Sequence, residues 1–143
     1  MGARPRLRRE LMRYLRNYPS EPLVPGENDC LTFTDGAWRA MHGYGWATDW
    51  IGRYASHGRF LGRKALIEAF GCDNILDAID GKLQRHNGVP PFGALVAAPG
   101  RAVFGQALGI CTGHHAAMIG KDGLCRIHID EITASWVDAK WRR

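Results

Sequence analysis

Apolar residues in the first part of the chain recur at the spacing of an amphipathic helix. They are Leu7, Leu11, Tyr14, Leu15 and Tyr18. This period predicts a helix over residues 6–17, whose apolar side faces a core and whose outer side is rich in arginine. Three prolines and a glycine follow between residues 19 and 26 and predict a loop with an extended path.

The next apolar run predicts a second helix. It begins at Asn28 or Asp29, because either side chain can cap the free amides of a first helical turn, and it ends at His42–Gly43. Three shorter helices are expected over residues 48–54, 61–70 and 74–83. The first half of the chain is therefore expected to be helical.

After Pro90 and Pro91 the pattern changes to short β-prone stretches separated by turns. These stretches are residues 94–98, 102–111, 114–119 and 124–129. Helices followed by antiparallel strands indicate an α+β fold, and no linker or repeat divides the chain. We therefore expect a single domain over residues 1–143, with residues 1–18 as a basic amphipathic N-terminal helix.

Composition and charge narrow the classes of protein that fit. The chain has 143 residues, 45% of them apolar, and its net charge is +5. This composition excludes a disordered chain, and no apolar run is long enough for a membrane span or a secretory signal. Residues 1–16 hold six arginines against one glutamate and so account for the whole net charge. A nucleic-acid-binding face on the body of the domain is disfavoured. The arginine-rich helix could contact nucleic acid, but such a stripe is more often a solvated face or a docking surface for an acidic partner.

The residue with the clearest chemical potential is Cys30. A sulfur in the first turn of a helix lies near free amides and the positive end of the helix dipole, which lower a thiol pKa. A thiolate with a histidine in reach is a nucleophile, and the predicted strands supply His114, His115 and His128. Cross-strand neighbours can orient one another, so a base and its orienting residue can lie side by side. Cysteine in an amphipathic helix is, however, also a common core residue.

Several segments in this order resemble the NlpC-type papain-fold peptidases, in particular the short members encoded among phage and gene-transfer-agent tail genes. The segments are the stretch from Pro25 through Asp29-Cys30 to Phe33, Gly52-Arg53-Tyr54, Gly93-Ala94-Leu95-Val96, Leu108-Gly109-Ile110, His114 to Gly120, Asp122-Gly123-Leu124, Arg126-Ile127-His128 and Trp136. The resemblance implies a papain-like domain with a helical half packed on a small antiparallel sheet.

The same resemblance implies catalytic roles for three residues. Cys30 would be the nucleophile, His115 its general base and His128 the residue that orients the base, with His114 as the alternative base. Only one of His114 and His115 can face Cys30, because successive strand residues point to opposite sides. The expected substrate is an amide bond in peptidoglycan peptides, cleaved by a hydrolase of the thiol protease type. Asp29, Trp46 and Trp50 are candidate substrate-binding residues.

The tail-gene resemblance also implies a setting. It predicts a component of the virion at the phage or prophage tail tip, made in the bacterial cytoplasm, which helps genome delivery through the cell wall. Its expected partners are peptidoglycan and tail-tip or hub proteins, the latter reached through the arginine-rich N-terminal helix. Neither a cofactor nor a membrane is implied.

Three departures from the family pattern favour a second hypothesis. Leu31-Thr32 replaces the usual Ser-Gly after the cysteine, Gly93-Ala94 lacks the usual aspartate, and Leu23 stands where a tyrosine often helps the oxyanion site. The alternative is therefore a catalytically inactive NlpC-like structural subunit of the tail tip.

A small zinc-binding domain is a further alternative. Cys111 with His114, and Cys125 with His128, form two CxxH pairs that together supply four tetrahedral ligands. The second pair lies in a predicted strand, where positions three apart face opposite sides. The leading prediction therefore contains no metal.

Overall fold

A computed structural model describes residues 3–139, with side chains throughout that range except those of residues 3, 4 and 101–103. The ends of the expected 1–143 domain, residues 1–2 and 140–143, lie outside the described residues. The helices are α1 (Ala3–Arg16), α2 (Cys30–His42), α3 (Arg63–Phe70), α4 (Ile75–Asp80) and the short 3-10 helix η1 (Ile129–Glu131). The strands are β1 (Ala55–Ser56), β2 (Arg59–Phe60), β3 (Gln84–His86), β4 (Leu95–Val103), β5 (Gln106–Cys111), β6 (His115–Gly120), β7 (Gly123–His128) and β8 (Ala134–Val137).

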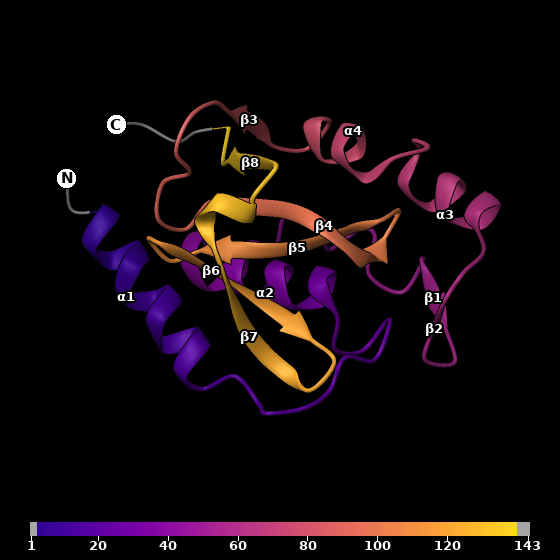
Figure 1. Ribbon diagram of the computed structural model, residues 1–143, viewed down its shortest axis with the longest axis horizontal. Coiled ribbons are helices and arrows are strands. Elements are labelled where there is room, and N and C mark those ends of the chain that lie inside the picture. Colours follow the sequence, from indigo (N-terminus) through magenta and orange to yellow (C-terminus); the bar gives the residue numbers. More distant parts are fainter. Residues whose placement is uncertain (1–2, 140–143) are drawn as a thin grey trace.

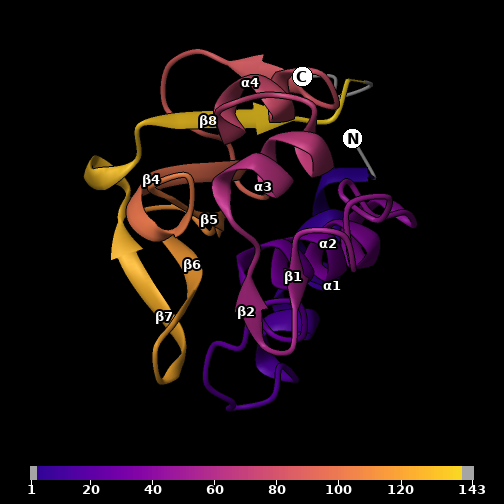
Figure 2. The same ribbon diagram turned by 90° about the vertical axis from the view of Figure 1, so that its right-hand side faces the viewer.

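Six strands form one antiparallel sheet in the order β3-β8-β4-β5-β6-β7, while β1 and β2 form a separate two-stranded hairpin. Figure 1 shows α2 behind the middle of the sheet, and the view in Figure 2 separates the sheet from α1 and α2. The expected α+β fold, with helices first and antiparallel strands afterwards, is confirmed at this level.

The side chains of successive strand residues point to opposite faces of the sheet, and buried residues lie on both faces. On the face toward α2, Leu95, Leu108 and Ile110 join the main core. On the opposite face, Val96 and Met118 belong to a smaller cluster. Along each strand, every second residue therefore lies on the face that packs against α2.

Helix α2 begins and ends where the capping residues predict. Asp29 is its N-cap, and Gly43 ends it in a left-handed conformation with φ of 84°. Glycine adopts this conformation without the steric cost that a Cβ atom imposes. The prediction of a helix that starts beside Asp29 and stops at His42–Gly43 is confirmed.

Two glycines set how the helices dock. Gly36 on α2 leaves room for the ring of Tyr14 on α1, whose hydroxyl donates to the carbonyl of Phe33 at 2.8 Å. At the other end of α2, a Cβ on Gly93 would lie 2.9 Å from Leu7 and 3.0 Å from Met41. The missing side chain of Gly93 thus lets the end of α2 pack close to the start of β4.

The helix expected over residues 48–54 does not form. This segment is a series of turns, because the buried carboxylate of Asp35 accepts hydrogen bonds from the Ala47 amide and the Thr48 hydroxyl. The sequence interpretation also missed the β1–β2 hairpin and the strands β3 and β8. None of the described helices has the length and apolar character needed to cross a bilayer.

Candidate functional site

Cys30 is the first residue of α2, as the capping pattern predicts. Its side chain is 1% exposed and belongs to the core between α2 and the sheet. The sulfur lies against the sheet, since the backbone of Leu108 on β5 hydrogen bonds to it. A substrate carbonyl has no open approach to this sulfur in the structure.

Asp29, expected to bind substrate, is fully buried. Its Oδ1 accepts from the amides of Leu31 and Thr32, each at 2.9 Å, and its Oδ2 accepts from the Gly26 amide at 2.6 Å. The hydroxyl of Tyr54 reaches both carboxylate oxygens, at 2.8 and 2.7 Å. Asp29 therefore serves as an internal anchor that joins the loop before α2, the first turn of α2 and Tyr54.

The thiol of Cys30 is not activated by its position. Burial is the largest influence on it and, together with the neighbouring Asp29 carboxylate, raises the pKa of the Cys30 thiol to about 12. Backbone hydrogen bonds from Leu108, Cys30 and Leu31 lower the pKa, but by less. The expectation of a lowered thiol pKa is wrong, because desolvation outweighs the favourable start of the helix.

Two backbone amides in the first turn of α2 are also engaged and so cannot stabilise an oxyanion. The N–H groups of Leu31 and Thr32 donate to Asp29 rather than toward an open space beside the sulfur. Since an oxyanion site needs donors aimed at the developing charge, the first turn of α2 does not supply one from these two residues.

The structure pairs two of the predicted catalytic histidines with each other. His115 on β6 lies directly opposite His128 on β7, and their ring centroids are 5.6 Å apart. His115 alternates with Ala116 and therefore shares the face of Ala117, which belongs to the core on the α2 side. His114 precedes β6 and is exposed.

The register separates this histidine pair from Cys30. His115 lies opposite Thr112, whose amide donates to the His115 carbonyl, whereas the Cys30 sulfur lies at Leu108. At about 3.3 Å per residue, the four-residue step from Leu108 to Thr112 covers about 13 Å. Cys30 and His115 thus share a face of the sheet but lie toward different ends of β5.

His128 has a local role that the sequence interpretation did not anticipate. Its Nδ1 accepts a hydrogen bond from the Asp130 amide at 3.1 Å, which makes His128 the N-cap of η1. Its side chain is 52% exposed. The imidazole is therefore held by the turn after β7 and stands beside His115.

Trp46 and Trp50, also expected to bind substrate, are core residues. They are 4% and 5% exposed, and their rings meet edge to face at a centroid distance of 5.6 Å. Trp46 also donates its Nε1–H to the Thr34 hydroxyl at 3.0 Å. Their burial leaves little ring surface for a ligand, so the structure favours a packing role.

The four residues of the zinc alternative do not converge. Cys111 is buried on the sheet face away from α2, and its thiol lies near the carbonyls of Pro90 and Gly113. Cys125 is exposed on β7. Among the residues that the structure describes, no group of three or more His, Cys, Asp or Glu side chains is placed to hold a metal ion.

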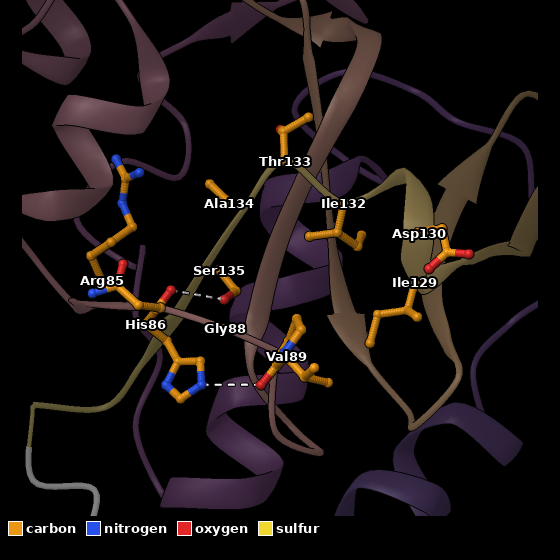
Figure 3. A pocket seen from close by; sticks show the side chains of 12 residues that line it. Arg85, His86, Gly88, Val89, Ile129, Asp130, Ile132, Thr133, Ala134 and Ser135 are labelled. Carbon is orange, nitrogen blue, oxygen red and sulfur yellow. Dashed lines mark hydrogen bonds between the residues drawn. The ribbon is translucent and has the colours of Figure 1, made fainter.

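A hollow of about 550 Å³ lies away from Cys30, between the loop after β3 and the segment from η1 to β8. Figure 3 shows Val89, Ile129 and Ile132 in its lining. His86 bonds to the Val89 carbonyl at 3.1 Å, and the guanidinium of Arg85 is paired with Asp80. These polar groups are therefore engaged in bonds that stabilise the segments around the hollow.

The sequence interpretation missed Asp35, a second buried carboxylate on α2. It binds Ala47 and Thr48, and Arg39 lies 3.5 Å from it. The available signal was an acidic residue among the apolar positions of a helix, since an unpaired charge is costly to bury. Asp35 fixes the loop after α2 and thereby the position of Trp46.

A family model described as a domain of unknown function, DUF6950, matches residues 3–137. No curated protein matches the chain.

Proposed function

This chain belongs to the DUF6950 family of unknown function, and we propose that it is a non-hydrolytic NlpC-like domain that serves as a structural subunit of a phage or prophage tail tip. The tail-tip setting and the papain-like architecture rest on the ordered motifs described above. The absence of hydrolysis rests on the surroundings of Cys30.

The observation that carries the proposal is the burial of the Cys30 thiol against β5. Its raised pKa leaves a negligible thiolate fraction at neutral pH, and a cysteine nucleophile needs the thiolate. The nearby amides are bound to Asp29, and the His115–His128 pair lies toward the other end of β5. The replacement of the usual Ser-Gly by Leu31-Thr32 agrees with this, because Leu31 is itself a fully buried core residue.

The competing function is the thiol-dependent peptidoglycan hydrolase. The features in its favour are the position of Cys30 at a helix start and the side-by-side arrangement of His115 and His128. It requires α2 to shift relative to the sheet so that the sulfur is exposed to a histidine. The same experiment therefore separates the two functions.

The test combines thiol labelling with digestion of purified peptidoglycan. A variant in which Cys72, Cys111 and Cys125 are replaced by Ser leaves Cys30 as the single thiol. We expect a thiol reagent to modify it only after unfolding, across pH 6 to 9, while Cys125 in the wild-type chain reacts at once because it is exposed. We also expect the same soluble muropeptides with the wild type and with Cys30→Ser. Release of peptides by the wild type that Cys30→Ser abolishes would refute the structural role.

A further inference from the structure

The outer side of α1 carries a line of exposed arginines. Arg6, Arg9, Arg13 and Arg16 are exposed and stand three, four and three residues apart, so they lie on one stripe of the helix. At 1.5 Å per residue this stripe, called the arginine face below, is about 15 Å long. Arg8 lies to one side, with its guanidinium 4.0 Å from the centre of the Phe92 ring.

Within the part of the chain that the structure describes, most of the positive charge of the arginine face is not neutralised. The ion pair described on this helix joins Arg13 to Glu10 at 3.3 Å. Beyond residue 16, basic and acidic residues are equal in number. A second copy of the chain also carries a net charge of +5, so net charge favours a different, acidic molecule as the partner.

A hollow adjoins the arginine face. It has a volume of about 410 Å³ and lies where α1 and its following loop meet α2. Its lining residues are Glu10, Arg13, Tyr14, Asn17, Tyr18, Pro19 and Ala40. A hollow of this kind receives an apolar side chain, and its rim shares Arg13 with the arginine face. Contacts that combine a buried apolar anchor with a charged rim are typical of protein interfaces.

The surroundings favour a protein over a nucleic acid or a membrane. The rings of Tyr14 and Tyr18 are occupied with Phe33, at centroid distances of 5.8 and 5.0 Å, so they are not free to stack on bases. A membrane-surface helix inserts its apolar side into lipid, but here that side is packed on α2, with Leu11 fully buried. Arginine pairs with carboxylates in a two-bond geometry, which suits an acidic protein segment.

We infer that the arginine face of α1 docks an acidic segment of a neighbouring protein, whose carboxylates pair with the arginines and whose apolar side chain enters the adjoining hollow. That the neighbour belongs to a tail tip rests on the proposed structural role, whereas the charge and shape of the surface favour an acidic protein independently of that role. Peptidoglycan cleavage that depends on Cys30 would refute the structural role without changing how this surface binds an acidic peptide.

The test measures binding of a short fluorescent peptide that carries glutamates at helical spacing around one central leucine. We expect Arg9→Gln/Arg16→Gln to weaken binding about tenfold, because two partly exposed ion pairs are lost. The matched control Arg53→Gln/Arg126→Gln removes the same charge from other exposed positions and should weaken binding less than twofold. Replacing the peptide's leucine by serine should weaken binding severalfold, and Ala40→Trp, which fills the hollow, should remove that difference.

Three outcomes would overturn the inference. One is no binding of the peptide to the wild type, and another is an equal loss of affinity in the two double variants. The third is tighter binding of duplex DNA or of phosphatidylglycerol vesicles than of the peptide through the same arginines. Thermal melting of each variant, compared with the wild type, shows that it is folded.

Discussion

The buried bond between Asp29 and Tyr54 gives the most direct test of how α2 is held. Asp29→Ala removes the N-cap of α2, which costs about 1 kcal/mol. It also leaves the buried hydroxyl of Tyr54 and the Gly26 amide without their acceptor, at about 1–3 kcal/mol for such a group. We expect a total loss of about 3–7 kcal/mol in the free energy of unfolding, a large share of the stability of a small domain.

Two further variants separate the cap from the cross-link. Tyr54→Phe keeps the ring and removes only the hydroxyl, so we expect a loss of about 1.5–3 kcal/mol, the value of a hydrogen bond to a charged group. Asp29→Asn keeps an acceptor for the first turn of α2 and should lie between the other two variants. Each is measured by urea unfolding followed through circular dichroism and tryptophan fluorescence.

A double-mutant cycle completes the test. If Asp29 and Tyr54 interact directly, Asp29→Ala/Tyr54→Phe costs less than the two single losses added together, by about 1–3 kcal/mol. Strict additivity, or a loss below 1 kcal/mol for Asp29→Ala, would show that Asp29 does not anchor the start of α2.

Two other predictions concern Cys30 and the β5–β6 pairing. Because the pKa of the Cys30 thiol rises from an ordinary value of 9.0 to about 12 in the folded chain, its contribution to stability is complete below pH 9 and is lost as pH rises toward 12. The free energy of unfolding of the wild type should therefore fall relative to Cys30→Ala by up to about 1.4 kcal/mol per pH unit above pH 9, and parallel pH profiles would contradict this. Gly109→Ala places a Cβ against the Ala117 carbonyl oxygen and the Met118 sulfur and should cost about 2–3 kcal/mol by urea unfolding. The control Gly43→Ala, at a left-handed position with open space around it, should cost about 1 kcal/mol, and equal losses would rule out the close approach of β6 to Gly109.

The candidate site shows where sequence reasoning reaches its limit. The position of Cys30 at a helix start follows from Asp29, a cap that acts within its own turn. The pairing of His115 with His128 follows from a short hairpin, in which the turn at residues 121–122 fixes the register. Both features depend on residues close in the chain.

The distance between Cys30 and the His115–His128 pair, in contrast, depends on contacts between residues far apart in the chain. Where Cys30 lies along β5 is decided by how α2 docks on the sheet, and Gly93 allows Leu7 and Met41 to pack there. Capping residues and turn residues act within a few positions of the chain, so they do not predict where α2 docks along β5. The same holds for the thiol pKa, because burial depends on everything packed around the sulfur.

By itself the sequence determined the order of helices and strands, the ends of α2 and the concentration of positive charge in the N-terminal helix, because each arises from the spacing of residues along a short stretch of chain. Only the tertiary structure decided that Cys30 is buried at Leu108, that Asp29 binds Tyr54 and that the histidines lie toward the other end of β5. These are contacts between segments far apart in the chain, and packing of the whole core selects them from the many arrangements that the local patterns permit.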